Sequence, residues 1–155
     1  MNLHEPKRIL VATDFSPCSR PATEYAVLLA RRFGASLHLV YVVEPPTFTS
    51  PEASSFVGQA IEAESTQGHK YLDAALVELA AAELTAVSGE IIVGLAADVT
   101  VGLANCGKYD LLLMGTHGRA GLKHLFLGSV AEHVIRHCDI PVVTVRSRPP
   151  HDDSK

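Results

Sequence analysis

The sequence has 155 residues, of which 47% are hydrophobic and 19% are charged. This length predicts one domain with a substantial core, which we place at residues 1–146, followed by a disordered tail at residues 147–155. The 13 basic and 17 acidic side chains give a net charge of −4, which argues against a nucleic-acid-binding domain, since such domains usually carry a basic surplus. No apolar run approaches the roughly 18 residues of a membrane span, and the opening residues MNLHEPKR do not resemble a signal peptide.

Cysteine usage indicates a reducing compartment. The three cysteines, Cys18, Cys106 and Cys138, show no CxxC spacing, so the sequence predicts neither a disulfide framework nor a zinc ribbon. Unpaired thiols of this kind are typical of proteins that stay reduced. We therefore expect a cytoplasmic protein that binds neither membrane nor nucleic acid.

Short apolar segments alternate along the chain with segments of helical periodicity. Apolar runs bounded by turn residues are typical of strands covered on both faces, whereas apolar residues recurring every three or four positions mark one face of a helix. The expected strands are Lys7–Thr13, Ser36–Val43, Glu90–Val93, Asp110–Gly115 and Ile140–Val145.

Four helices are expected between these strands. Ser16-Pro17 combines an N-cap residue with proline at the first helical position, and Asp98 is a second candidate cap. Gly34 and Ser88-Gly89 are the expected stops of the first two helices. The expected limits are Ser16 to Gly34, about Ser55 to Val87, Asp98 to about Cys106, and Ser129 to about His137.

Strands that alternate with helices predict an α/β fold with a single open five-stranded parallel sheet and helices on both faces. The crossovers in such a sheet are right-handed. Ligands bind beyond the carboxyl ends of the strands, at the point where the strand order reverses. The strand ends to consider are therefore Thr13-Asp14, Val42-Val43, Gly94 and Gly115.

A glycine-containing loop follows the fourth expected strand. Its skeleton is Gly115-x2-Gly118-x9-Gly128-Ser129, which starts at a strand end and finishes at a helix start. Gly118 permits a positive φ and a close approach of a ligand, and the helix-start amides favour an anion. Arg119, Lys123 and His124 add positive charge to the same loop. The sequence therefore predicts a phosphate site, although it contains neither GxxxxGK[ST] nor a GxGxxG after the first strand.

The G-x2-G-x9-G-S pattern, the opening ILVATDFSP and the closing DIPVVTVR resemble the universal stress protein family over about residues 7–146. The resemblance implies a Rossmann-like, adenine-nucleotide α-hydrolase-like fold with strand order 3-2-1-4-5. The first and fourth strands are neighbours in that order. Asp14 and the loop after Gly115 would then flank one crevice, where the strand-end rule also places the site.

The resemblance further implies that the chain binds ATP, or ADP or AMP, together with Mg²⁺. Asp14 would lie near the ribose and phosphates and help to hold the ion, and Val42 would meet adenine through its backbone. Ala12, Thr13 and Met114 would line the pocket. The residues expected to hold ribose and phosphates are Gly115, Gly118, Gly128, Ser129 and Val130, with His117 and Arg119 in the same loop.

Several of these side chains have plain structural alternatives. Asp14 at a strand end is also a candidate cap for the next helix, in competition with Ser16, and His117 is either a phosphate contact or a turn residue. His133 and His137 stand four residues apart, a spacing that can bind metal, but their polar neighbours favour a solvated helix face. No Ser–His–Asp or Cys–His spacing indicates a catalytic set, so no catalytic residue is predicted.

The leading hypothesis is a nucleotide-responsive regulatory or stress-survival factor. One alternative is a slow ATPase or another nucleotide-transforming enzyme of the same fold. A third hypothesis is an interaction module that keeps ATP as a structural ligand. A water-positioning residue aimed at the γ-phosphate would separate the first two, and the sequence nominates only Asp14 and His117 for that role.

The fifth expected strand, Pro141 to Val145, is an edge strand in the implied order. Val142, Val143 and Val145 make it apolar, and an uncovered apolar edge invites aggregation. Pairing with a second copy about a twofold axis removes that edge. The resemblance therefore implies a homodimer that forms through this strand.

Overall fold

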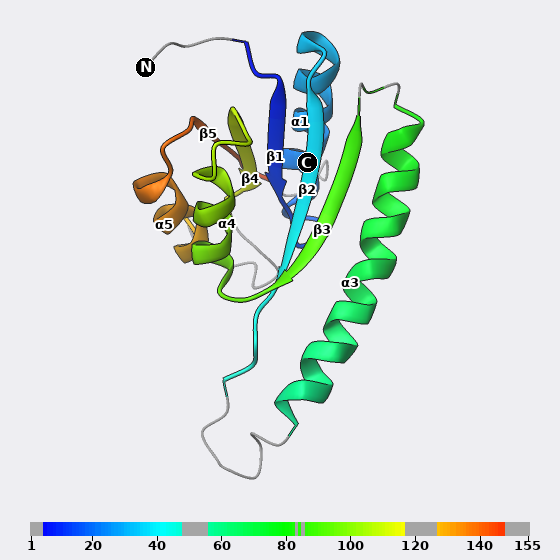
Figure 1. Ribbon diagram of the computed structural model, residues 1–155, viewed down its shortest axis with the longest axis vertical. Coiled ribbons are helices and arrows are strands. Elements are labelled where there is room, and N and C mark those ends of the chain that lie inside the picture. Colours follow the sequence, from blue (N-terminus) through cyan, green and yellow to red (C-terminus); the bar gives the residue numbers. More distant parts are fainter. Residues whose placement is uncertain (1–4, 48–55, 83, 85, 117–126, 148–155) are drawn as a thin grey trace, which may run out of the picture.

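The computed structural model describes residues 5–47, 56–82, 84, 86–116 and 127–147. Its strands and helices alternate along the chain, as Figure 1 shows. Their limits are β1 (Arg8–Ala12), α1 (Arg20–Phe33), β2 (Ser36–Val43), α3 (Val57–Ala80), β3 (Val87–Val93), α4 (Ala96–Ala104), β4 (Leu111–Gly115), α5 (Ser129–His137) and β5 (Val142–Val145).

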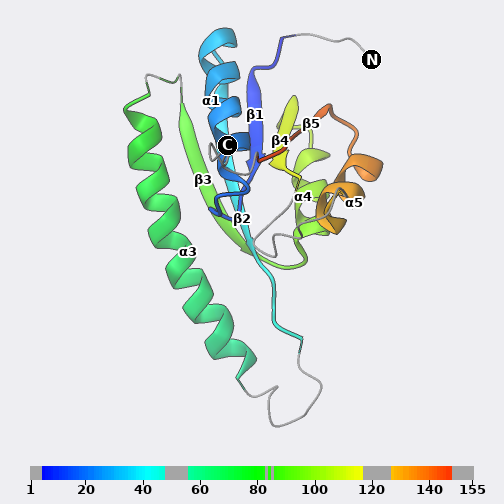
Figure 2. The ribbon, with the colours of Figure 1, turned by 180° about the vertical axis from the view of Figure 1, so that it is seen from behind.

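The five strands form one sheet of order β3-β2-β1-β4-β5, in which every pair is parallel. This confirms the predicted fold class and strand order. Helices α1 and α3 lie on one face of the sheet, and α4 and α5 lie on the other (Figures 1 and 2). The strand order reverses between β1 and β4, so the predicted crevice falls between neighbouring strands.

Alternate residues of β1 supply the two halves of the core. Ile9 and Val11 pack with α1 and α3, whereas Leu10 packs with α4 and α5. All three side chains are fully buried. Residues on both faces of a central strand are covered, which explains why the segment is an uninterrupted apolar run and not an alternating one.

Helix α1 begins later than the sequence predicted. Its N-cap is Ser19, not Ser16, because the carbonyl oxygen of Ser16 already accepts the N–H groups of Ser19 and Arg20 in a tight turn. The proline that occupies the first helical turn is therefore Pro21 and not Pro17. Gly34 ends the helix as expected, with a left-handed φ of 62° that glycine adopts without strain.

The predicted boundary between α3 and β3 is wrong. Helix α3 ends at Ala80, and Val87, Ser88 and Gly89 belong to β3, where they pair with Leu37, His38 and Leu39 of β2. Gly89 does not stop a helix. It lets α3 approach the sheet, since a Cβ at this position would lie 2.6 Å from a methyl carbon of Leu72.

Smaller differences affect the other elements. Asp98 lies in the first turn of α4 and is not its cap, because the N-cap is Leu95. Strands β4 and β5 begin at Leu111 and Val142, slightly inside their predicted limits, while β2 and α5 match theirs. The predicted tail lies outside the described residues, except for residue 147.

Candidate functional site

A cleft of about 370 Å³ lies beyond the carboxyl ends of the strands on the α4 and α5 side of the sheet. Its position coincides with the reversal of strand order between β1 and β4. A volume of this size is within the range of small-molecule sites. The lining residues are Ala12, Thr13, Asp14, Ser19, Val40, Tyr41, Val42, Glu44, Glu64, Ala96, Thr100, Met114, Gly115, Thr116, Val130 and Ala131.

The structure brings most of the predicted site residues together in this cleft. Among the described residues, those that line it are Ala12, Thr13, Asp14, Val42, Met114, Gly115 and Val130. Gly128 and Ser129 form the start of α5 directly before Val130, although they do not line the cleft themselves. The predicted His117, Gly118 and Arg119 lie outside the described residues.

The turn after β1 positions Asp14 at the cleft. The Thr13 hydroxyl oxygen lies 3.1 Å from the Ser19 hydroxyl oxygen and accepts the N–H of Phe15 at 3.1 Å. Phe15 has a φ of 56°, a left-handed conformation that is uncommon for a bulky residue. Strain of this kind is often found at functional sites.

Asp14 does not cap α1, which was its structural alternative. Its Oδ1 accepts the N–H of Ser16 at 3.0 Å, within the turn, while Ser19 occupies the N-cap position. The carboxylate therefore stabilises the turn and faces the cleft at the same time.

The start of α5 supplies main-chain N–H groups beside the cleft. Gly128 has extended φ and ψ angles and donates its N–H to the carbonyl oxygen of Thr116 at 2.9 Å, which ties the helix start to the end of β4. The next three residues are the first helical ones, and their N–H groups have no acceptor within the helix. Two of them, Val130 and Ala131, line the cleft. This arrangement suits an anion.

Sequence reasoning missed the contribution of α3. Glu64 of this helix accepts a hydrogen bond from the Tyr41 hydroxyl, with 2.7 Å between the oxygens, and both residues line the cleft. Gly68 makes the approach possible, because a Cβ there would lie 2.6 Å from the Tyr41 ring. A glycine in the middle of a long helix was the available signal, since it costs helix stability unless packing requires it.

A second cavity of about 350 Å³ adjoins the cleft. Asp14 and Glu64 line both spaces, whereas Phe15, Gln67 and Tyr71 line the second cavity but not the cleft. Phe15 also contacts the rings of Tyr41 and Tyr71, at centroid distances of 5.6 and 6.0 Å. The turn after β1 and helix α3 thus contact each other and line this second cavity together.

The histidines at helical spacing do not form a metal centre. His133 and His137 stack at a centroid distance of 4.2 Å, and His133 Nε2 lies 3.6 Å from Asp98 Oδ1. His137 Nδ1 lies 2.7 Å from the carbonyl oxygen of His133. Within the described part of the chain, no group of three or more His, Cys, Asp or Glu residues suits a metal ion.

One Ser–His–Glu set does come together, although the sequence spacing gave no sign of it. His38 Nδ1 lies 2.8 Å from Ser88 Oγ, and Nε2 lies 3.0 Å from Glu90 Oε1. Ser88 is the register partner of His38 across β2 and β3, toward the amino ends of the strands and away from the cleft. None of the cavities described above is lined by these residues, and cross-strand pairs of this type stabilise a sheet.

No helix within the described residues is long and apolar enough to cross a membrane.

Comparison with known proteins identifies clear relatives. The model of the universal stress protein family matches residues 5–146. A universal stress protein of Methanocaldococcus jannaschii is 32% identical over 143 residues, which cover 90% of this chain and 82% of the relative. Some longer curated relatives are matched over only 50% of their length.

Solved structures share the fold. Universal stress protein UspA from Lactobacillus plantarum superimposes with a TM-score of 0.82 at 23% identity, covering 94% of this chain and 100% of that one. A universal stress protein solved in complex with cAMP superimposes with a TM-score of 0.66 at 26% identity, covering 94% of this chain and 100% of that one.

Proposed function

Because the chain belongs to the universal stress protein family, we propose that it is a nucleotide-responsive regulatory or stress-survival factor that binds ATP in the cleft. The observation that carries this proposal is the convergence of three strand ends and the start of α5 on one cleft at the point of strand reversal. The structural neighbour in complex with cAMP supports an adenine nucleotide as the ligand class.

In this proposal the nucleotide spans the cleft from β2 to α5. The backbone of Val42 meets adenine, and Ala12, Thr13 and Met114 form the floor. The ribose and phosphates lie toward the end of β4 and the start of α5. The residues assigned to them are Gly115, Gly118, Gly128, Ser129 and Val130, with His117 and Arg119 from the intervening loop.

The Asp14 carboxylate fits a magnesium ion bound with the nucleotide. Magnesium prefers oxygen ligands and is commonly held by one or two carboxylates together with substrate phosphates. Asp14 offers carboxylate oxygens at the cleft, in the turn after β1, and β1 is the neighbour of β4, which leads into the phosphate loop. The ion would neutralise phosphate charge near a carboxylate that otherwise repels it.

Binding without rapid hydrolysis is the favoured outcome. The three carboxylates that line the cleft each accept a hydrogen bond from the protein: Asp14 from Ser16 N–H, Glu44 from Ala96 N–H and Glu64 from the Tyr41 hydroxyl. These hydrogen bonds hold the three carboxylates in place within the protein, whereas a general base must lie within hydrogen-bond reach of the attacking water. The slow ATPase therefore stays the second candidate.

The proposal includes a cytoplasmic location. The cysteines Cys18, Cys106 and Cys138 are unpaired, which supports a reducing compartment such as the cytoplasm.

The proposal also includes a homodimer. Strand β5 stands at an edge of the sheet, which supports a dimer formed through this strand. A dimer whose surface does the work, with ATP as structural ligand, is the third candidate.

Calorimetry with ATP, ADP and AMP, with and without Mg²⁺, tests the proposal. We expect saturable binding of one nucleotide to each chain. The absence of binding at millimolar nucleotide would overturn the assignment. A turnover number on the order of 1 s⁻¹ or more, which dedicated enzymes reach, would favour the enzymatic alternative.

A further inference from the structure

Two helices begin at the cleft. Helix α4 starts at Ala96 and helix α5 at Ser129, and the cleft lining includes Ala96 from the first and Val130 from the second. The N-terminus of any helix offers N–H groups and a partial positive charge that attract anions. The phosphates of a nucleotide in this cleft could therefore bind at either of two helix starts.

The start of α4 already holds a carboxylate. Glu44 Oε1 accepts the N–H of Ala96 at 2.7 Å. The N-cap residue, Leu95, has no side-chain acceptor of its own, so Glu44 supplies one from the segment that leaves β2. Asp98, in the first turn of the same helix, does not line the cleft, and its Oδ1 lies 3.6 Å from His133 Nε2. An incoming phosphate would meet the negative charge of Glu44 and would have to displace this carboxylate from Ala96.

The start of α5 differs in its cap. Its N-cap is Gly128, which has no side chain, and its cap shows no side-chain hydrogen bond among the described residues. The acidic residue in its first turn, Glu132, is paired with Arg136 at 2.7 Å, which offsets its charge. The two helix starts at the cleft are therefore electrostatically unequal.

We infer that Glu44 is a positioning residue that sets the direction in which a nucleotide lies in the cleft. Its carboxylate excludes phosphate from the start of α4 and leaves the start of α5 as the place for it. The base is then directed to the side formed by β2 and α4. This inference rests on the proposed function, because it concerns the same cleft.

The experiment records the main-chain ¹H–¹⁵N resonances of the full chain during titration with inorganic pyrophosphate. In the parent protein we expect shifts at Ser129 and Val130 and none at Ala96. In Glu44→Ala the Ala96 resonance should also shift, and pyrophosphate affinity at that end should rise about tenfold, as expected when a helix start becomes available to an anion. Glu44→Gln keeps an acceptor oxygen for Ala96 and loses only the charge, so its gain should be smaller but still above the parent.

Adenosine provides a second readout that a purely structural cap would not change. In the parent protein, adenosine and pyrophosphate should bind together, one at each end of the cleft. In Glu44→Ala, pyrophosphate at the α4 end should lower the affinity for adenosine. Asp98→Asn is the matched control, because it removes a charge from the same helical turn while the Glu44–Ala96 hydrogen bond stays in place.

Two results would overturn the inference. One is a shift of Ala96 by pyrophosphate in the parent protein at the concentrations that shift it in Glu44→Ala. The other is the absence of any gain in both Glu44 variants when their thermal melts show an intact fold, which would leave Glu44 as a helix cap only. Failure of ATP to bind the parent would count against the proposed function, whereas the Ala96 result still decides the role of Glu44.

Discussion

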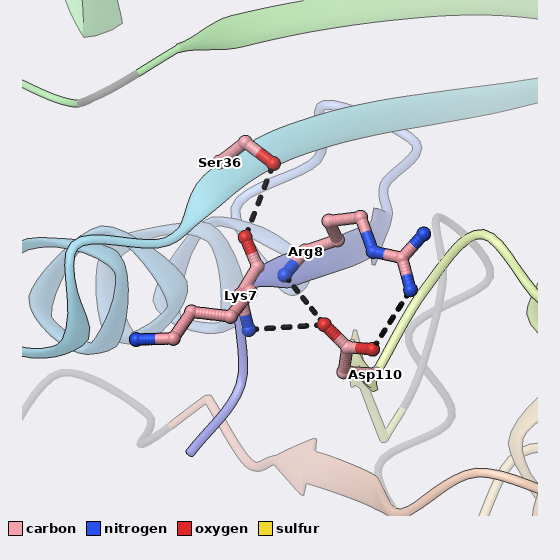
Figure 3. Close-up of polar contacts among 4 residues, drawn as sticks. All are labelled: Lys7, Arg8, Ser36 and Asp110. Atoms are coloured by element: carbon pink, nitrogen blue, oxygen red, sulfur yellow. Dashed lines mark hydrogen bonds and ion pairs between the residues drawn. The ribbon is translucent and has the colours of Figure 1, made fainter. Parts of the chain in front are cut away.

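Asp110, the residue before β4, connects the start of this strand to the start of β1 through hydrogen bonds with Arg8. Its Oδ2 accepts the backbone N–H of Arg8 at 2.9 Å and that of Lys7 at 3.0 Å, and its Oδ1 lies 3.1 Å from the Arg8 guanidinium (Figure 3). The carbonyl oxygen of Lys7 accepts two hydrogen bonds from Ser36 at the start of β2. The amino ends of three neighbouring strands are thus held by one short segment.

These contacts make the stability of the fold depend on pH. Burial raises the pKa of Asp110, but the hydrogen bonds from the Arg8 side chain and the two backbone N–H groups outweigh it and hold the pKa below its ordinary value of 3.8. A carboxyl group with a lowered pKa in the folded state stabilises that state above the unfolded pKa. The stabilisation is lost as the pH falls from that value through the lower, folded one.

Asp110→Asn should therefore lower the free energy of unfolding at pH 7, by about 1–3 kcal/mol, because an amide cannot accept these bonds as a charged group does. The difference from the parent protein should shrink as the pH falls below 3.8 and through the lower pKa of the folded state. Urea denaturation at pH 7 and at a series of lower pH values measures it. Asp73→Asn, which removes an exposed carboxylate on α3, should change little. An Asp110→Asn effect that stays the same across this pH series would contradict the role given to the charge.

The sequence predicted the central strands and the start of α5 because their signals are local. The run Ser36–Val43 is apolar and is bounded by turn residues at both ends, so β2 was predicted at its true limits. Gly128-Ser129 marks the entry to α5 for the same reason. The strand ends then placed the cleft through the rule for parallel sheets.

The residues that were missed depend on packing between distant segments. Glu64 reaches the cleft only because α3 sits close against Tyr41, and Glu44 reaches Ala96 across 52 positions of the sequence. The error at Gly89 has the same cause. The sequence analysis interpreted this glycine as the end of a helix, whereas its missing side chain makes room for α3 against the sheet. Periodicity within one element carries no information on how two elements are placed against each other.

Gly68→Ala offers a test of the contact between α3 and the sheet. Alanine normally favours a helix over glycine by about 1 kcal/mol. Here the added Cβ would lie 2.6 Å from the Tyr41 ring and 3.0 Å from a carbon of Ile91, so overpacking should instead destabilise the fold by about 1–3 kcal/mol. ATP affinity should fall as well, because Tyr41 and Glu64 line the cleft.

Gly58→Ala is the matched control for this substitution. Gly58 lies in the same helix, and a Cβ there would meet nothing within 4 Å. Its replacement should leave stability unchanged or raise it by up to about 1 kcal/mol. Chemical denaturation of the two variants compares them directly. Equal effects of the two alanines would mean that α3 is not seated on Tyr41 as described.

Ser129→Ala tests the start of α5 as the phosphate site. The substitution removes a hydroxyl donor but leaves the helix-start N–H groups, so ATP affinity should fall by about 1–2 kcal/mol, roughly 5- to 30-fold. The affinity for adenosine, which lacks phosphates, should stay the same. Ser65→Ala on α3, outside the cleft lining, serves as the control. If Ser129→Ala weakened ATP and adenosine equally, the hydroxyl would not be a phosphate contact.

The proposed dimer can be tested by a substitution at Thr144. This residue is chosen because of the direction in which its backbone N–H and carbonyl groups point. The carbonyl oxygens of Pro141 and Val145 accept N–H groups of Leu112 and Thr116, so the backbone groups of these odd-numbered residues point toward β4. Because strand residues alternate, the N–H and carbonyl groups of Thr144 point to the open edge.

Thr144→Pro should therefore block strand pairing between two copies at little cost to the sheet, because proline is tolerated on the open side of an edge strand. This choice avoids Val143, whose side chain packs on the core and whose replacement by lysine would disturb the fold. Sedimentation at tens of micromolar should show a dimer for the parent and for Thr144→Ala, which keeps the N–H, and a monomer for Thr144→Pro. Thermal melts verify that the proline variant is folded. A folded Thr144→Pro variant that remains dimeric would place the interface elsewhere than β5, and a monomeric parent would remove the dimer altogether.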